Sequence, residues 1–263
     1  MSRSSLKNVS RLLDDAVKVS PIETNFIEDL KRSIELDSVK GWRKPSQTFK
    51  PSSMQCMRNS YYQIMGVEPD KGESSYNSMG IVNSGSDIHE RTQQAITRME
   101  DNGMKCKWID VGEFVTKREL KDIVVREKLG METKLFNSKY NISFMCDGII
   151  TYKNKYYIVE IKTETSSKFY ARQGVDPKHY NQATAYSLSL GLDDVIFIYI
   201  SRDMLEMKSF MYTVTDKMRR ELVKYITDVQ EYVNRAIAPP KQKDLPKNVC
   251  TYCPYKSNCR RTG

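Results

Sequence analysis

The sequence contains no apolar run that approaches the roughly 20 residues needed to span a bilayer. Residues 1–20 reach Asp14 and Asp15 without an apolar segment, so we expect neither a secretory signal nor an organellar transit peptide. A GxxxxGK(S/T) phosphate-binding loop, internal repeats and low-complexity tracts are also absent from the sequence. These absences predict a cytoplasmic protein that has no membrane span and no P-loop motor of its own.

Positive charge is in excess, because 42 Lys and Arg stand against 33 Asp and Glu, for a net charge of +9. Five of these nine charges lie in the last 23 residues, a segment that contains Lys241, Lys243, Lys247, Lys256, Arg260 and Arg261 against Asp244. Such a balance supplies salt-sensitive attraction to phosphate, although a need for solubility explains it about equally well. The tail lacks an amphipathic stripe, so a membrane surface is a poorer partner.

Two strand-like segments, 144–150 and 157–162, contain three charged residues among apolar ones: Asp147, Glu160 and Lys162. Burial of an unpaired charge costs several kcal/mol, so a buried strand keeps a charge only for pairing, metal binding or catalysis. The three charges therefore mark a candidate site.

A hairpin would bring the three charges together. If residues 153–154 form a two-residue loop, the sequence numbers of paired residues sum to 307, so that Asp147 lies opposite Glu160. Lys162, two residues beyond Glu160, then points to the same face of the hairpin. Carboxylates about 5 Å apart at Cβ repel each other unless a proton or a cation lies between them, and Mg²⁺ or Mn²⁺ accepts such ligands. Two alternatives stay open: a structural ion-pair cluster, and a three-residue loop that separates the carboxylates onto opposite faces.

Asp147 and the run Glu160-Ile161-Lys162 resemble the D…(D/E)xK core of the PD-(D/E)XK nuclease superfamily, with Cys146 in the place of the usual proline. Residues 85–90, Gly-Ser-Asp-Ile-His-Glu, resemble the Gly…His helix motif of the RecB-like branch. Residues 182–186, Gln-Ala-Thr-Ala-Tyr, match its QxxxY motif. Each motif is weak alone, but their common order makes the resemblance specific.

The resemblance implies a metal-dependent phosphodiester hydrolase, whose chemistry one or two divalent ions support. Its metal ligands would be Asp147, Glu160, His89 and the backbone carbonyl of Ile161. An imidazole among carboxylates shifts the preference of the site from Mg²⁺ towards Mn²⁺. Taken alone, His89 would be an ordinary surface or capping histidine.

The resemblance also implies residues that handle the substrate. Lys162 would contact the attacking water and the scissile phosphate, while Gln182 and Tyr186, on one helix face, would hydrogen-bond the site together. A buried tyrosine beside an exposed glutamine is the alternative. Basic and aromatic residues interleave between the strand and this helix, which is typical of single-strand binding; the predicted contacts are Lys168, Tyr170, Arg172, Lys178 and Tyr180.

Cys250, Cys253 and Cys259 have C-x2-C-x5-C spacing, which in a reducing cytosol indicates a metal site that lacks one ligand. Cys56 lies in a segment that resembles the N-terminal cysteine helix of iron–sulfur RecB-like nucleases, which include AddB and the CRISPR-associated four-cysteine exonucleases. The resemblance implies that the four cysteines hold a 4Fe–4S cluster that clamps the chain's ends around the core. Four thiolates also satisfy tetrahedral Zn²⁺, which stays the alternative.

Apolar periodicity predicts helices near 22–34, from 52 to 66, from 84–87 to 99, at 178–190 and at 218–233. The strand-like segments are 106–115, 131–137, 142–151, 155–163, 195–200 and 209–214, and residues 68–78 read as a loop. Cys106 and Cys146 lie in strand-like runs and are expected in the core. We expect an α/β fold, a restriction-endonuclease-like mixed sheet flanked by helices, with a helical region at 1–79, a nuclease core at 80–238 and a basic cysteine-bearing tail at 239–263.

The sequence thus predicts a metal-dependent DNA nuclease, an exonuclease or flap-type enzyme that acts on single strands or DNA ends in recombination, repair or processing. A helicase or recombination protein would be a separate partner chain. A non-catalytic DNA-binding or assembly subunit with the same fold, and a nuclease acting on RNA, are the alternatives.

Overall fold

A computed structural model describes residues 21–40, 45–70 and 75–261, which form two compact units. The first unit contains α2 (Pro21–Lys40), a predicted helix that is confirmed, and the first turns of α4 (Tyr76–Thr97). There the backbone N–H of Tyr76 donates to Oε1 of Glu35 at 2.8 Å. The second unit contains the remainder of the described chain, including α4 from Val82 onward and every residue of the predicted site.

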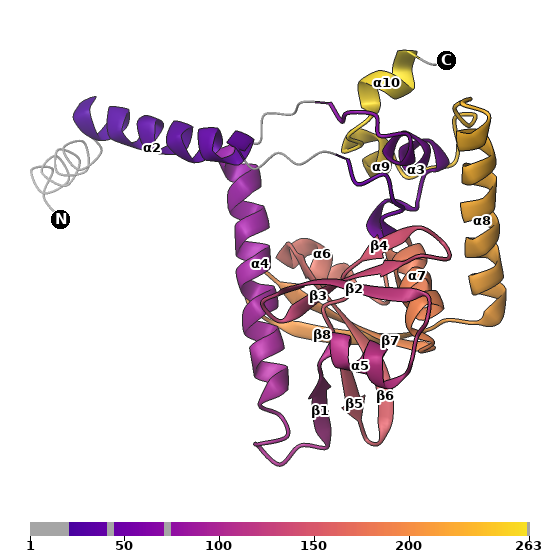
Figure 1. The fold of residues 1–263 in the computed structure, drawn as a ribbon. Coiled ribbons are helices and arrows are strands. Elements are labelled where there is room, and N and C mark those ends of the chain that lie inside the picture. Colours follow the sequence, from indigo (N-terminus) through magenta and orange to yellow (C-terminus); the bar gives the residue numbers. More distant parts are fainter. Residues whose placement is uncertain (1–20, 41–44, 71–74, 262–263) are drawn as a thin grey trace, which may run out of the picture. The chain divides into compact units, whose positions relative to one another are not determined.

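A five-stranded mixed sheet forms the centre of the second unit (Figure 1). Its strands, in spatial order, are β1 (Cys106–Ile109), β5 (Gly148–Tyr152), β6 (Lys155–Glu164), β7 (Asp194–Ser201) and β8 (Met207–Thr213). Neighbours are antiparallel except β6 and β7, which are parallel and need a crossover connection. That crossover contains α6 (Ser166–Ala171), the 3-10 helix η2 (Pro177–His179) and α7 (Tyr180–Leu190). The predicted α/β class, a mixed sheet flanked by helices, is confirmed.

The β5–β6 hairpin has the predicted two-residue turn. Both residues of the loop, 153 and 154, are left-handed, with φ of 48° and 68°, as a type I′ turn requires. Gly148 pairs with Val159 at the end of the ladder, so that paired positions sum to 307, and this register places Asp147, one residue beyond the ladder, opposite Glu160. The predicted register is therefore confirmed, and it fixes the face to which each side chain of β6 points.

Helices cover both faces of the sheet. On one face, Ile88 and Ile96 of α4 pack into a cluster with the odd-numbered Val159 and Ile161 of β6. On the other face, α7 and α8 (Asp216–Asn234) contribute to the larger core cluster, which contains the even-numbered Ile158. Alternation along β6 thus directs Glu160 and Lys162 towards the side of α7.

A second sheet has three antiparallel strands, β2 (Ile123–Leu129), β3 (Glu132–Asn137) and β4 (Ile142–Phe144). Strand β2 was not predicted. The predicted strand at 106–115 is wrong beyond residue 109, because Asp110 caps the helix α5 (Val111–Lys117) by accepting the N–H of Glu113 at 3.0 Å. The predicted strand at 142–151 breaks at 145–147, where the chain passes from the small sheet to the large one.

Segments from distant parts of the sequence meet beside the sheet, where α3 (Met57–Ile64) lies next to α9 (Lys247–Thr251) and α10 (Lys256–Arg261) (Figure 1). Nε of Arg58 donates to the carbonyl of Pro239 at 2.5 Å, and the N–H of Asp70 donates to the carbonyl of Pro254 at 2.6 Å. The helix predicted from 52 begins later, after the 3-10 turn η1 (Pro51–Ser53). Helix α4 begins earlier than predicted, at Tyr76, and takes in the last residues of the predicted loop.

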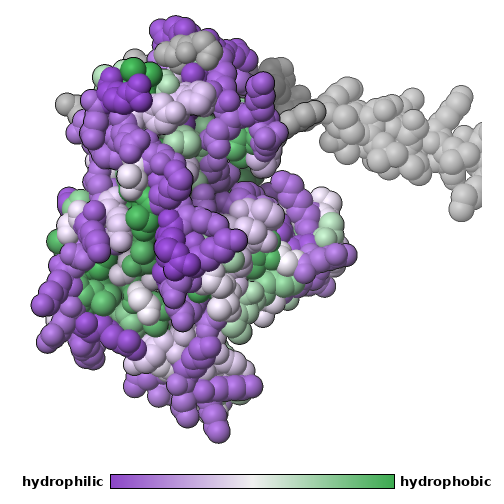
Figure 2. Space-filling view, turned by 90° about the vertical axis from the view of Figure 1, so that its right-hand side faces the viewer, coloured by the Kyte–Doolittle hydropathy of each residue, from purple (hydrophilic) through white to green (hydrophobic). Residues whose placement is uncertain are grey.

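Within the described residues, the helices are all too short or too polar to cross a membrane. The face drawn in Figure 2 is mostly hydrophilic and is broken by smaller apolar patches.

Candidate active site

Asp147 and Glu160 lie together where the β5–β6 pairing ends, and both are buried, with 8% and 3% of their surfaces exposed. The N–H of Ile161 donates to Oδ2 of Asp147 at 2.5 Å, and Nε2 of Gln93 on α4 donates to the Asp147 carbonyl at 2.7 Å. The N–H and C=O of one strand residue point to the same side, so the carbonyl of Ile161 also lies on the side of Asp147. Three of the predicted metal ligands are thus neighbours.

The carboxylate of Glu160 is only half satisfied. Its Oε1 accepts hydrogen bonds from Nζ of Lys162 at 2.5 Å and from Nε2 of Gln182 at 2.6 Å. Its buried Oε2 has no partner among the described residues, a rare condition that costs free energy. Burial, and next the charge of Asp147, raise the pKa of Glu160 to about 7 against the opposing effect of Lys162.

Gln182 and Tyr186 link α7 to both strands of the site. The amide of Gln182 that donates to Glu160 also donates to Oη of Tyr186 at 2.8 Å. The hydroxyl of Tyr186 in turn donates to the carbonyl of Met145 at 2.7 Å, two residues before Asp147. Burial, followed by the charge of Glu160, raises the pKa of Tyr186, so the phenol keeps its proton and remains a donor.

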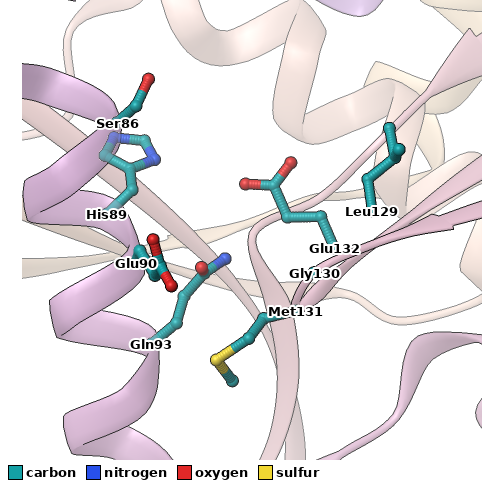
Figure 3. A pocket seen from close by; sticks show the side chains of 8 residues that line it. All are labelled: Ser86, His89, Glu90, Gln93, Leu129, Gly130, Met131 and Glu132. Atoms are coloured by element: carbon teal, nitrogen blue, oxygen red, sulfur yellow. The ribbon is translucent and has the colours of Figure 1, made fainter. Parts of the chain in front are cut away.

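His89 and Glu132 approach the same site from α4 and from the start of β3. Nδ1 of His89 lies 3.6 Å from Oδ1 of Asp147, and His89, Glu132 and Asp147 each offer one ligand atom within 4.8 Å of the others. Figure 3 shows the imidazole and the Glu132 carboxylate on opposite sides of a cavity of about 330 Å³. His89 is thus placed as predicted, whereas Glu132 was not predicted.

Burial and the charges of neighbouring groups together shift the pKa values around this cavity. Burial, and then the charge of Asp147, raise the pKa of Glu132. Burial opposes a charged His89, but its hydrogen bond to Asp147 and the charge of that residue outweigh burial, so the pKa of His89 is raised. Burial likewise lowers the pKa of Lys162, but the charges of Glu160 and Asp147 outweigh burial, so the pKa of Lys162 is raised. The site therefore concentrates negative charge that protons, Lys162 or a cation must offset.

The residues predicted to contact DNA fall into two sets. Lys168, Arg172 and Lys178 line one cavity of about 200 Å³, which Lys162 also lines. Tyr170 is 56% exposed and lies outside that lining, while Tyr180 stacks on Tyr212 with ring centroids 4.6 Å apart. The basic residues thus lie beside the site, and both tyrosine rings have partners within the chain, since Tyr170 contacts Phe169 edge to face with ring centroids 5.5 Å apart.

The four predicted cluster cysteines, Cys56, Cys250, Cys253 and Cys259, line a third cavity, of about 220 Å³. Hydrogen-bond donors surround their sulfurs: the N–H of Tyr255 lies 3.4 Å from Sγ of Cys253, and Nη1 of Arg58 lies 3.5 Å from Sγ of Cys259. Burial raises the pKa of the Cys56 and Cys253 thiols. Cys106 and Cys146 are buried in the core, as predicted.

The sequence matches no family model and no curated protein. Among solved structures, the crystal structure of SSO0001 is similar with a TM-score of 0.47 and 17% identity, over 90% of this chain and 98% of that one. The alkaline exonuclease LHK-Exo from Laribacter hongkongensis is similar with a TM-score of 0.38 and 11% identity, over 73% and 90% of the two chains. The structure of LHK-Exo in complex with dAMP is similar with a TM-score of 0.40 and 10% identity, over 72% of this chain and 89% of that one.

Proposed function

We propose that this protein is a divalent-metal-dependent deoxyribonuclease of the RecB-like PD-(D/E)XK type. The observation that carries the proposal is the buried pair Asp147 and Glu160, with Lys162 on the same face and Oε2 of Glu160 left without a partner in the described part of the chain. A purely structural ion-pair cluster would be expected to pair both oxygens of a buried carboxylate. A divalent cation would be a partner for Oε2.

The donor set fits a divalent ion. Carboxylate and carbonyl oxygens are the ligands that Mg²⁺ and Mn²⁺ prefer, and the imidazole favours Mn²⁺. The residues that would hold the ion are Asp147, His89 and Glu132, whose ligand atoms lie within 4.8 Å of one another, and Glu132 adds to the predicted set. The other predicted ligands, Glu160 and the carbonyl of Ile161, lie beside Asp147 but outside this group. Burial is the main cause of the raised pKa values of Glu132 and Glu160, and a cation here would offset the second cause, the charge of Asp147.

When bound, the ion supplies hydroxide near neutral pH and polarises the phosphate. The side chains around it have separate tasks. Lys162 is charged at neutral pH because its pKa is raised, so it orients the attacking water and donates to the scissile phosphate rather than removing a proton. Gln182 fixes the rotamer of Glu160 and leaves Oε2 available. Tyr186 ties the segment before Asp147 to the same helix.

Nucleic acid is the substrate that the surroundings favour. The net charge of +9 and the basic cavity beside Lys162 attract phosphates, and the exposed ring of Tyr170 offers a stacking surface for a base. DNA rather than RNA, and a role in recombination, repair or processing, rest on the family resemblance. Because the sequence has no P-loop, strand separation would come from a separate helicase or recombination protein.

We also propose that the four cysteines hold a 4Fe–4S cluster. Their cavity contains Lys241, Lys256 and Arg260, whose charges offset those of thiolates. Four thiolates would also satisfy a single tetrahedral Zn²⁺ ion. The choice of a cluster over zinc rests on the family resemblance. The cluster would join α3 to α9 and α10.

The proposed function can be tested with purified protein and single strands labelled at the 5′ or the 3′ end. We expect cleavage with Mg²⁺ and at least as much with Mn²⁺, none with a chelator, and slower cleavage of RNA of the same sequence. DNA binding without cleavage under every metal condition would favour the non-catalytic subunit. Faster cleavage of RNA would reassign the substrate.

A further inference from the structure

The cavity of about 330 Å³ that contains His89 and Glu132 has two unlike walls. Polar side chains of α4 form one wall, and the tip of the β2–β3 hairpin, residues 129–132, forms the other (Figure 3). The hairpin wall includes two large apolar side chains, Leu129 and Met131, which offer no oxygen or nitrogen ligand to an ion. The metal site thus explains the polar lining of this cavity and leaves its apolar part without a role.

The turn of the hairpin fixes the place of Leu129. Leu129 pairs with Glu132, so the loop has two residues, and φ is positive only at the first of them, Gly130, at 61°. This is the pattern of a type II′ turn, which matches the twist of the two strands. Directly paired residues point their side chains to one face, with Cβ atoms about 5 Å apart. Leu129 is therefore held beside Glu132, whose carboxylate would bind the ion.

The apolar side chains at the hairpin tip are open to solvent. Leu129 is 43% exposed, and Met131 is half-buried. Single exposed apolar side chains are ordinary on a protein surface. Two of them in the lining of one cavity, next to the residues that would bind an ion, form a surface that a bound ligand would cover. Covering this surface is favourable in proportion to the apolar area removed from water, so an apolar contact beside the ion is available to a substrate.

The charge of this cavity selects the part of a substrate that can enter it. Its lining contains the carboxylates of Glu90 and Glu132 and no lysine or arginine. The cavity beside Lys162 has the opposite character, because five cations and a single carboxylate line it. A phosphate would be repelled by the two carboxylates unless the ion lies between them, so the space beyond the ion suits an uncharged group. In a nucleotide, that group is the base with its sugar.

We infer that Leu129 and Met131 contact the base of the nucleotide next to the scissile phosphate, an inference that rests on the proposed nuclease function. Each base has a planar apolar face that aliphatic side chains cover through dispersion and the exclusion of water. Such contacts have no direction, so any of the four bases fits them. Ser86 and Glu90, on the opposite wall, offer polar groups to the edge of the base. The hairpin tip would thus align the strand with the ion without reading its sequence.

The inference is tested with two versions of one labelled single strand, which have either thymine or an abasic sugar at one position. With Mn²⁺, the wild type should cut the bonds beside the abasic sugar about fivefold more slowly than those beside thymine, as loss of a partly buried leucine contact implies. Leu129→Ala should bring this ratio close to one, and Leu129→Met should retain it. Val124→Ala, on the same strand and 46% exposed but outside the cavity lining, is the matched control and should keep the wild-type ratio.

A wild-type ratio near one, or a ratio that Leu129→Ala leaves unchanged, would overturn the inference and leave the nuclease assignment standing, because a merely structural leucine affects both strands equally. If neither strand is cut, the nuclease proposal fails, and fluorescence anisotropy with Mn²⁺ measures the affinity for the two strands instead. The wild type should then bind the thymine strand about threefold tighter or more, and Leu129→Ala should lose this preference. An equal preference in the two proteins would overturn the inference. Thermal melts identify a variant that does not fold, and Met131→Ala then replaces Leu129→Ala.

Discussion

Nε2 of Gln182 lies 2.6 Å from Oε1 of Glu160, so a helix residue holds the carboxylate of a strand residue in one orientation. The same amide donates to the hydroxyl of Tyr186, which fixes the amide in turn. This contact leaves Oε2 of Glu160 as the oxygen that faces no protein donor among the described residues. Gln182 is therefore a positioning residue whose effect should pass through the metal.

Gln182→Ala should weaken Mn²⁺ binding and lower cleavage by roughly 10- to 100-fold, the usual cost of losing a residue that orients a metal ligand. The measurement is the Mn²⁺ concentration that gives half-maximal cleavage, which should rise. Thr184→Val, at another buried position of α7 whose hydroxyl bonds to the carbonyl of Tyr180 and to the side chain of Tyr212, both outside the metal site, is the matched control and should keep the wild-type value. A lower rate in Gln182→Ala with an unchanged metal requirement would contradict this role.

The raised pKa of Glu160 predicts how the stability of the metal-free protein depends on pH. A carboxyl whose folded-state pKa lies above its ordinary value of 4.5, here at about 7, contributes stability below pH 4.5 that is lost as the pH rises through 7. With a chelator, the wild type should therefore lose stability between pH 5 and pH 8, by an amount on the order of 2 kcal/mol.

Glu160→Gln removes this titration, so its melting temperature should fall less between pH 5 and pH 8. His89 is present in both proteins and its contribution is common to them. Added Mn²⁺ should restore the wild type at pH 8 and have little effect on the variant. An equal fall in melting temperature in the two proteins would show that ionisation of Glu160 does not destabilise the folded state.

His89→Ala and Glu132→Gln should each weaken Mn²⁺ binding by about tenfold or more, because each removes a ligand atom beside Asp147. Glu90→Gln is the matched control, since Glu90 lines the same cavity but lies outside the group of three ligand atoms. Calorimetric titration of each protein with Mn²⁺ measures the effect. If Glu132→Gln binds like Glu90→Gln, Glu132 is an acidic neighbour and not a ligand.

Anaerobically purified protein should be brown and contain iron and sulfide if the four cysteines bind a cluster. Cys56→Ser and Cys253→Ser should lose the colour and several degrees of melting temperature, because the cluster joins segments that lie 194 positions apart (250 minus 56). Cys106→Ser, at a buried position outside the cysteine cavity, should keep the colour. Colourless protein with one zinc per chain would show that zinc, and not a cluster, cross-links the cysteine segments. Metal-free protein of full stability would exclude both the cluster and the cross-link.

The sequence predicted the parts of the site that depend on local geometry. The register of Asp147 against Glu160 follows from a two-residue turn, and the alignment of Gln182 with Tyr186 follows from helical spacing. Glu132 could not be found in this way, since it belongs to the other sheet and reaches the site through tertiary packing alone.

Three errors in the predicted fold have different causes. Asp110 carries a helix-capping signal that was readable in the sequence, but the apolar residues around it resembled a strand continuing from β1. Strand β2 is largely exposed, with Ile123 as its buried residue, so it shows no alternation of buried and exposed positions that would mark it. The start of α4 lies in the other compact unit, outside the apolar pattern on which its prediction was based.

The most direct test of the central claim compares cleavage and binding of one labelled single strand by the wild type and by Asp147→Ala, Glu160→Ala and Lys162→Ala, with Mn²⁺ present. The wild type should cut the strand, and each variant should lose cleavage while keeping most of its affinity, because basic residues outside the three supply most of the attraction to phosphate. Cleavage by Glu160→Ala at the wild-type rate would contradict the assignment of this site.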